Sequence, residues 1–438
     1  MRRVSLYMFT ALVLALGTAL VGCGDDDDDN GGGDGGGGAV SGDVRIAGVW
    51  TGQEAESFQA VLDGFTEENP DVNVEYDAAG DELPTVLSTA VEGGNPPDLA
   101  AIPQPGLIAD FVQQGALQPL DFANDALEEN FSEGTLDIAT FDGERYGVLF
   151  KAANKSTVWY NVPLFEQAGV EPPETYEELL EAAGTLKASG TRAYSLGGAD
   201  GWTLTDLFEN IYVRQAGPEM YDQLADHEIP WTDQSVKDAL ETMAEIVGDA
   251  DNIAGGTSGA IQTAFPDSVQ QAFKENPEAA MVIEGDFVAS EIQNSTNAEP
   301  ETDFNVFAFP SVDDSESMVV GGGDTMVLFS DSPAAQALIE YLATPEAAEI
   351  WAERGGFSSA NQNLDANVYP DELVRTTASA IAEADVFRFD MSDLQPARFG
   401  GTVGQGLWKL FQDFVRSPDN VDGITQQMER AAARAFGE

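Results

Sequence analysis

The residue types that most often perform catalysis are scarce in this chain. It has one histidine, His227, which stands beside Asp226 and Glu228 in a polar loop, and one cysteine, Cys23. A histidine metal cluster and a Ser-His-Asp triad are therefore poorly supported, and the chain has neither a Gly-x-Ser-x-Gly elbow nor a phosphate-binding loop. We expect no catalytic residue, metal or cofactor. Two of the 77 acidic residues could still flank a glycosidic bond, which leaves a secreted hydrolase as an alternative.

Tryptophan and polar side chains stand instead where predicted strands end. Trp50, Gln53 and Glu54 follow the strand predicted over Val44–Trp50. Open α/β sheets bind ligands at the carboxyl ends of their strands, so this junction is a candidate contact. The alternative is that Trp50 packs in the core and that Glu54 only favours the N-terminus of the next helix.

Five further candidates occupy similar positions. Gln104 lies between two prolines after a short strand, where it could also be a simple turn residue. Asp200 and Trp202 lie on a loop between a strand and a helix, and Asp200 could instead cap that helix. Glu284 and Asp286 end another strand, and Asp286 could likewise be an N-cap.

The remaining candidates are less tied to strand ends. Lys155 could donate hydrogen bonds to a ligand, or it could only pair with a neighbouring carboxylate. Trp231 follows a proline and could equally cover the outer surface, and Phe357 is expected behind the tryptophans. Gly323 and Asp324 belong to a glycine run that suits a hinge or a backbone approaching a ligand.

The elements that must position these residues alternate between strand and helix. The first half of the body predicts β-α-β-α-β-α, with strands over 44–50, 73–76 and 98–102 and helices over 54–67, 83–92 and 106–114. This order predicts an open α/β sheet. Residues 145–161 read as an extended crossing between lobes, and the chain is expected to cross back near Gly321–Asp324. Thr175 and Glu178 form a capping box for a helix to about Ser189, and the segment beyond about Asp371 reads as helical.

The first forty residues predict export and attachment to a membrane. Arg2-Arg3, an apolar run and small residues ending at Cys23 resemble the lipobox of prokaryotic lipoproteins. We therefore expect a signal peptide over 1–22, lipidation of Cys23 and an Asp/Gly tether over 23–42. An export signal without lipidation is the alternative. Either way the body would lie outside the cell membrane.

The charge balance narrows the possible partners. Lys plus Arg is 19 and Asp plus Glu is 77, which gives a formal net charge of -58. Such a chain is an implausible partner for nucleic acid. Since molar salt screens this self-repulsion and the hydrophobic content is a normal 43%, we expect a halophilic protein whose stability rises with salt. The length exceeds what one hydrophobic core serves and predicts two lobes.

Several local patterns together resemble those of the extracellular solute-binding proteins of ABC importers. Within this family, the chain is most similar to the carbohydrate group, which includes alpha-glucoside and maltose-type proteins. None of the patterns is diagnostic alone, and their order and spacing over most of the chain carry the resemblance. They are Phe58–Phe65, Glu67–Pro70, Asn95–Asp98, Gly115–Leu120, Val158–Asn161, Gly201–Thr203, Glu284–Asp286, Gly321–Asp324 and Leu342–Glu346.

The resemblance implies a periplasmic-binding-protein-like fold of two α/β lobes, joined by a multi-segment hinge with the ligand cleft between them. The expected lobes are 44–152 plus about 310–365, and about 153–309 plus 366–438. The resemblance further implies a monomer that closes around a sugar or oligosaccharide of the alpha-glucoside type and delivers it to the transmembrane subunits of an ABC permease. Aromatic rings would cover the sugar's C–H faces and carboxylates or amides would bind its hydroxyls. The remaining alternatives are a non-sugar solute and a non-transport surface protein, such as an adhesin or a sensor partner.

Overall fold

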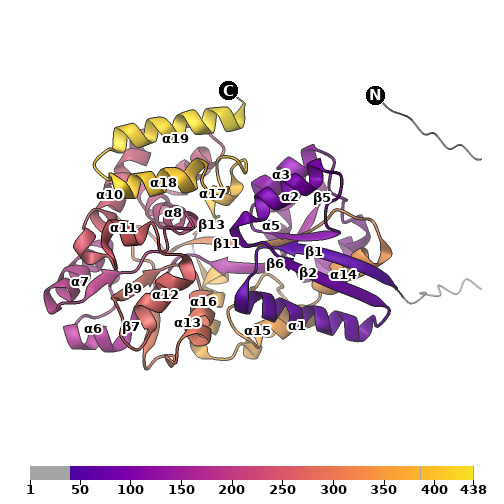
Figure 1. Ribbon diagram of the computed structural model, residues 1–438, viewed down its shortest axis with the longest axis horizontal. Coiled ribbons are helices and arrows are strands. Elements are labelled where there is room, and N and C mark those ends of the chain that lie inside the picture. Colours follow the sequence, from indigo (N-terminus) through magenta and orange to yellow (C-terminus); the bar gives the residue numbers. More distant parts are fainter. Residues whose placement is uncertain (1–39, 385, 438) are drawn as a thin grey trace, which may run out of the picture. The chain divides into compact units, whose positions relative to one another are not determined.

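Two β-sheets with helices packed around them organise the chain (Figure 1). The computed structural model describes residues 40–384 and 386–437. The predicted signal peptide and Cys23 lie outside the described residues, as does most of the predicted tether. Of that tether only 40–42 are described, and Gly42 already belongs to the first strand.

The first sheet begins with three parallel strands, β1 (Gly42–Gly48), β2 (Val72–Ala78) and β3 (Leu99–Ile102). They are connected by α1 (Gly52–Glu68), α2 (Leu83–Glu92) and α3 (Pro105–Gln113). Helix α1 buries Phe58, Val61, Leu62 and Phe65, whose spacing of three and four residues places them on one face. The predicted β-α-β-α-β-α opening is confirmed.

Two long antiparallel strands complete this sheet. They are β6 (Gly147–Asn154) and β11 (Met318–Leu328), and both are buried along their whole length. The strand order is β12-β6-β11-β3-β1-β2, with β13 beside β11. Figure 1 shows β6 and β11 between the helices of the two halves of the molecule. Short elements near this sheet are α4 (Asn124–Asn130), α5 (Glu133–Asp137), β4 (Thr140–Phe141), β5 (Glu144–Arg145) and β12 (Ser358–Ser359).

The glycine run at Gly321–Asp324 lies inside β11, between Met318 and Val320, which pack in one hydrophobic cluster, and Met326 and Leu328, which pack in another. Each glycine is covered by a neighbour. A Cβ on Gly321 would lie 2.2 Å from the ring of Phe387, and one on Gly322 would lie 2.8 Å from the Lys155 stem. The run therefore serves close packing on both faces of the strand. The connections between the two sheets are at 154–157 and at 308–318.

The second sheet has the order β10-β7-β9-β8. Its strands are β7 (Thr157–Asn161), β8 (Arg192–Tyr194), β9 (Ala279–Ile283) and β10 (Phe304–Ala308). The helices in this part of the chain are α6 (Val162–Ala168), α7 (Tyr176–Ser189), α8 (Trp202–Ala216), α9 (Pro218–Ala225), α10 (Gln234–Val247), α11 (Gly256–Ala260), α12 (Phe265–Phe273) and α13 (Val288–Ser295). The predicted capping box of α7 is present, because Glu178 N donates to Thr175 Oγ1 at 3.2 Å and Thr175 N to Glu178 Oε2 at 3.3 Å.

After β11 the described chain is mostly helical, apart from the short strands β12 and β13. Ser332 and Thr344 cap α14 (Pro333–Leu342) and α15 (Pro345–Ala352) as expected. The later helices are α16 (Glu372–Glu383), α17 (Met391–Leu394), α18 (Gly406–Arg416) and α19 (Val421–Phe436). The all-helical expectation beyond Asp371 is wrong at β13 (Val386–Phe389), which pairs in parallel with Met318–Gly321. This short segment becomes a strand because β11 offers it an open edge, which no local pattern reveals.

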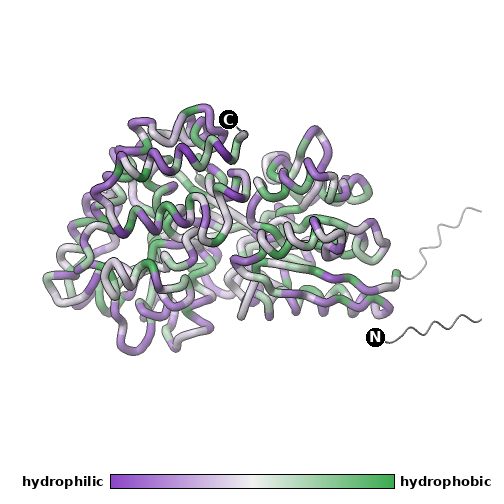
Figure 2. Tube along the Cα trace, turned by 45° about the horizontal axis from the view of Figure 1, so that its top comes forward, coloured by the Kyte–Doolittle hydropathy of each residue, from purple (hydrophilic) through white to green (hydrophobic). Residues whose placement is uncertain are grey.

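Hydrophobic side chains fill both halves of the molecule. One cluster contains Val158, Phe208 and Phe411, and another contains Val44, Phe58 and Trp351. Figure 2 shows outer helices in which hydrophilic and hydrophobic residues alternate. The second cluster also includes Trp159 and Ile292, so packing is continuous across the expected lobe boundaries, whose positions stay a prediction. Within the described residues, every helix is too short or too polar to span a membrane.

Candidate functional site

A cavity of about 230 Å³ opens between the two sheets. One wall comes from elements of the first sheet and carries Glu54 of α1, Asp81 after β2 and Gln104 at the N-cap of α3. The facing wall carries Trp202, the first residue of α8, and Phe265, the first residue of α12. The carboxyl ends of the parallel strands therefore open into this cavity, as expected for an open α/β sheet.

Three aromatic rings form one wall. The ring centroids of Trp202 and Phe265 are 5.2 Å apart, those of Phe265 and Phe287 are 5.3 Å apart, and those of Trp202 and Phe287 are 6.0 Å apart. The tilted and edge-on angles match the arrangements that aromatic quadrupoles favour. Gly201 lets this wall form, because a Cβ there would lie 2.5 Å from Trp408 Cβ. Trp202 is thus held against α18 with its indole at the cavity.

Ion pairs form the opposite wall. Lys151 Nζ lies 2.5 Å from Glu54 Oε1 and 3.9 Å from Asp324 Oδ2. Trp50 Nε1 donates to the same Asp324 oxygen at 2.7 Å. Burial opposes the charge on Lys151, but Glu54 and Asp324 raise its pKa above the ordinary value. The ammonium also lies 5.5 Å from the ring centroid of Phe287, so it bridges the ionic and aromatic walls.

Two carboxyl groups approach each other across the cavity. Asp81 comes from the first-sheet side and Asp200 from the loop before α8. Burial, then Asp200, then Glu82 raise the pKa of Asp81 to about 7, although the indole of Trp202 donates a hydrogen bond to it. Burial likewise raises the pKa of Asp200. The hydrogen bond between Trp202 and Asp81 joins the two walls.

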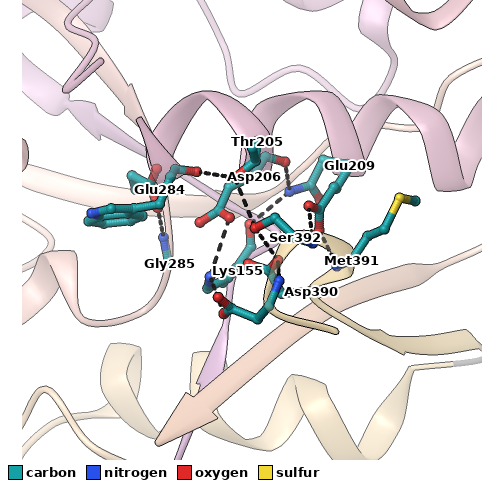
Figure 3. Close-up of polar contacts among 12 residues, drawn as sticks. Lys155, Thr205, Asp206, Glu209, Glu284, Gly285, Asp390, Met391 and Ser392 are labelled. Atoms are coloured by element: carbon teal, nitrogen blue, oxygen red, sulfur yellow. Dashed lines mark hydrogen bonds and ion pairs between the residues drawn. The ribbon is translucent and has the colours of Figure 1, made fainter. Parts of the chain in front are cut away.

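A denser cluster of charged side chains surrounds Lys155 (Figure 3). Lys155 forms an ion pair with Asp390 and lies 3.3 Å from Asp206 Oδ1 and 3.7 Å from Asp393 Oδ2. Burial would lower the pKa of Lys155, but the three aspartates raise it well above its ordinary value. Burial opposes ionisation of Asp390 as well, yet Lys155 and hydrogen bonds lower its pKa to about 2.

The surroundings of Asp206, Asp393 and Glu284 oppose their ionisation. Burial raises the pKa of Asp206, Asp393 and Glu284 well above the ordinary range, and neighbouring acids add to the effect. Figure 3 shows Glu284 directed at Asp206, and Asp206 at Lys155. Lys155 also lies 5.8 Å from the Trp202 ring centroid, so this cluster supports the floor of the cavity.

Two buried polar atoms at the cavity have no hydrogen-bond partner among the described residues. They are Gln104 Oε1, which can only accept, and Trp408 Nε1, which can only donate. A buried polar group without a partner costs free energy, so such atoms mark places where a ligand is bound favourably. A hydroxyl group can serve both, because it donates one hydrogen bond and accepts others.

The structure brings most of the predicted residues to this cavity. Those that line it are Trp50, Glu54, Gln104, Lys155, Asp200, Trp202, Gly323 and Asp324. Trp50 exposes only 1% of its surface, and its ring centroid lies 4.6 Å from that of Phe58. It is therefore packed in the core and also lines the cavity. Lys155 pairs with carboxylates, which is the alternative given for it, and still reaches the cavity.

The other five candidates lie elsewhere. Gln53 lines a separate pocket of about 240 Å³, the ring of Trp231 packs 5.4 Å from that of Phe399 in a hydrophobic core, and the ring of Phe357 stacks 5.2 Å from that of Trp351. Glu284 lies one layer behind the cavity against Asp206, and Asp286 accepts a hydrogen bond from Asn154 N at 3.1 Å. None of these side chains contributes to the wall of the cavity.

Sequence reasoning missed several lining residues, which are Asp81, Lys151, Phe265, Phe287, Asp393 and Trp408. Asp81 carried a usable signal, because it follows the second parallel strand by three residues. Lys151 and Trp408 carried none, since a strand interior and an amphipathic helix gave no reason to expect them here. Within the described residues, no group of histidine, cysteine, aspartate and glutamate has the geometry to hold a metal ion.

Two α/β lobes around a cavity with an aromatic wall and an ionic wall define the class of two-lobed solute receptors. Residues 51–349 match the family described as bacterial extracellular solute-binding protein, and the chain belongs to that family. The resemblance noted from the sequence is confirmed.

Relatives and solved structures agree with this assignment. The chain is 35% identical over 399 residues to the osmoprotective compounds-binding protein GgtB of a Synechocystis species, covering 89% of this chain and 92% of that protein. It is 32% identical over 393 residues to the alpha-glucosides-binding periplasmic protein AglE of Rhizobium meliloti, covering 86% and 84%. The bacterial solute receptor AcbH has the same fold, with a TM-score of 0.79, 20% identity and coverage of 90% and 99%. The GacH receptor of Streptomyces glaucescens follows with a TM-score of 0.72, 19% identity and coverage of 91% and 99%.

Proposed function

We propose that this protein is the extracytoplasmic binding component of an ABC importer and that it captures a sugar of the alpha-glucoside class. The observation that carries the proposal is that an aromatic wall and a charged wall line the same cavity. The aromatic wall consists of Trp202, Phe265 and Phe287, and the charged wall of Glu54, Lys151 and Asp324. A pyranose has apolar C–H faces that an aromatic ring covers and a belt of hydroxyls that charged groups bind.

The volume of the cavity favours a short ligand, and the partners of its carboxylates favour binding without cleavage. A volume of about 230 Å³ is below the roughly 300–1,000 Å³ typical of sites for drug-sized ligands, so we infer a mono- or disaccharide. The carboxylates nearest the aromatic wall are engaged by Lys151, Trp50 and Trp202. They serve positioning, and we propose that the protein has no catalytic activity.

The setting follows from the family and from the predicted leader. We propose lipidation of Cys23, attachment to the outer face of the cell membrane by residues 23–42, and delivery of the closed, ligand-bound form to permease subunits as a monomer. Closure is stabilised by the ligand because only the closed state contacts it from both walls. The net charge of -58 supports a working environment of high salt.

The test is a thermal shift of residues 40–438 in high salt against mono-, di- and oligosaccharides. The panel includes maltose, trehalose and sucrose, because one relative is named for alpha-glucosides and another for osmoprotective compounds. Glycine betaine represents a non-sugar osmoprotectant. A ligand at 100 times its Kd stabilises the native state by about 2.7 kcal/mol.

Each outcome assigns the protein differently. A shift with a short alpha-glucoside that is recovered intact supports the proposal. A shift followed by loss of the sugar identifies the hydrolase alternative instead. A shift with glycine betaine alone replaces the sugar by a non-sugar solute and contradicts the substrate class proposed here.

A further inference from the structure

A second cavity lies on the other face of the segment that connects the two sheets. Its volume is about 460 Å³, and its lining includes Asn154 and Ser156, whereas Ala153 and Lys155 line the first cavity, described above as the candidate functional site. Alternate residues of an extended chain point to opposite sides, so the two cavities share this segment but no lining residue. No part of the proposed function uses the second cavity.

Two charged side chains line this cavity, Glu316 and Arg214, and Arg214 lies in the last turn of α8. Only 6% of its surface is exposed. Its Nη1 donates to Asn210 O and to Asn210 Oδ1, both at 3.0 Å, and its Nη2 donates to Met318 O at 2.6 Å. A guanidinium has five N–H groups, so these three bonds leave two of them without a partner among the described residues. One face of the guanidinium is covered by Phe309, with its carbon 4.9 Å from the ring centroid.

Arg214 differs from the other buried basic residues of the described chain. Lys151 and Lys155 are paired with two and three carboxylates respectively. Arg214 forms no ion pair with an acid of the described residues, although the chain has 77 acids and only 19 basic residues. Burial alone lowers the pKa of Arg214 to about 9, with no carboxylate acting against it.

An unpaired buried cation is costly, which makes this cavity favourable for an anion. The carbonyls, the C-terminal end of α8 and Phe309 offset part of that cost. Hydroxyl groups add donors, because Ser315 and Ser317 line the same cavity and neither donates a side-chain hydrogen bond within the described residues. Since so little of Arg214 is exposed, the anion must be small to reach it.

We propose that the second cavity is an anion site, in which the Arg214 guanidinium binds a small inorganic anion of the size of chloride. High salt favours this binding in two ways: it supplies the anion, and it screens the repulsion from a chain of net charge -58. The bound anion would stabilise the junction of α8 with β11, because Arg214 already connects Asn210 to Met318.

The test separates specific binding from screening by changing the anion at constant sodium concentration. Melting temperatures of the purified protein are measured while sodium gluconate is replaced stepwise by sodium chloride. Above its Kd, chloride should raise the Tm by about 1–2 °C for each tenfold increase. The same titration is run on Arg214→Gln, which keeps hydrogen-bonding capacity but loses the charge.

The matched control is Arg388→Gln, because Arg388 is bound by Asp222 at 2.6 and 2.9 Å at the surface. The proposal requires the chloride response in the native protein and in Arg388→Gln, and its loss in Arg214→Gln. An equal response in all three proteins would overturn it. If Arg214→Gln does not fold, the anion site is tested by growing crystals of the native protein in bromide. Anomalous scattering should place a bromide at the guanidinium, and an empty cavity would overturn the proposal.

Two carboxylates of the chain itself are the rival counter-ions, and one of them, Glu316, lines the second cavity without forming an ion pair with Arg214. The other, Asp385, follows the lining residue Ala384 in the sequence and lies outside the described residues. Under the proposal, Asp385→Asn leaves the chloride response unchanged. A chloride response that appears only in Asp385→Asn would assign Asp385 to Arg214 and overturn the anion site.

Discussion

Two lysines four residues apart carry the positive charge of the cleft, and their surroundings differ. Lys151 pairs with Glu54, whose side chain remains 33% exposed at the cavity. Lys155 pairs with Asp390, whose side chain is 1% exposed, and lies near Asp206 and Asp393. The first network is at the surface of the cleft, and the second is enclosed beneath it.

From this difference we infer that the Lys151 network contacts the ligand and that the Lys155 cluster stabilises the fold. The Lys155 cluster connects β6, α8 and α17, and Glu209 fixes α17 there by accepting hydrogen bonds from Met391 N at 2.7 Å and Ser392 N at 2.9 Å. It therefore holds the C-terminal part of the chain under the cleft. The Lys151 network can exchange its hydrogen bonds with a ligand, because one of its partners is accessible.

The largest effect expected from this contrast is on stability at Lys155. Lys155→Met would leave Asp206, Asp390 and Asp393 buried without their cation, and we expect a loss of roughly 3–5 kcal/mol in the free energy of unfolding. Chemical denaturation in high salt measures it. The control is Lys187→Met, whose pair with Asp249 is exposed and should contribute at most about 1 kcal/mol. Equal losses in the two variants would remove the distinction drawn here.

Lys151→Met should act mainly on ligand affinity. A hydrogen bond to a charged group contributes about 1.5–3 kcal/mol, so Kd should rise roughly 10- to 100-fold while the melting temperature changes less than in Lys155→Met. Isothermal titration with the sugar identified by thermal shift gives Kd. Lys409→Met, which breaks a surface pair with Asp413, is the control for general charge effects. An unchanged Kd would exclude Lys151 from recognition.

Trp202→Ala tests the aromatic wall. Loss of stacking is expected to cost about 1 kcal/mol or more, which is a fivefold or larger rise in Kd by the relation of about 1.4 kcal/mol per factor of ten. Trp231→Phe is the matched control, because Trp231 lies in the core and away from the cavity. If Trp231→Phe weakens binding as much as Trp202→Ala does, the assigned wall is not the binding surface.

A pH dependence of stability is expected from Asp81. Its pKa is raised to about 7, so the native state keeps a proton that the unfolded state releases near pH 4. The contribution of Asp81 to stability is therefore present below about pH 4 and is lost as the pH rises through 7. Asp81→Asn should melt at a higher temperature than the native protein at pH 8, with a smaller difference at pH 5. Glu82→Gln serves as the control, and a difference independent of pH would refute this role for Asp81.

Sequence reasoning located the part of the site that depends on strand ends. Glu54, Gln104 and Trp202 were found because a polar or aromatic residue at a strand-to-helix junction faces the edge where parallel strands end. It failed to separate Trp231 from Trp202, since both are tryptophans near a helix start and only packing distinguishes them. Lys151 was not singled out because a strand interior gives no indication of which strand will cross the cleft.

The sequence by itself determined the class of protein. Local signals for helices, caps and parallel strands act over a few residues, and together with the export-like leader and the charge of -58 they indicated an extracellular two-lobed receptor. Tertiary structure decided the rest. It paired β13 with β11, placed Lys151 at the surface of the cavity and Lys155 in an enclosed cluster beneath it, and buried Arg214 without an ion pair to any acid of the described residues. These features depend on contacts between residues far apart in the chain, and no local pattern encodes them.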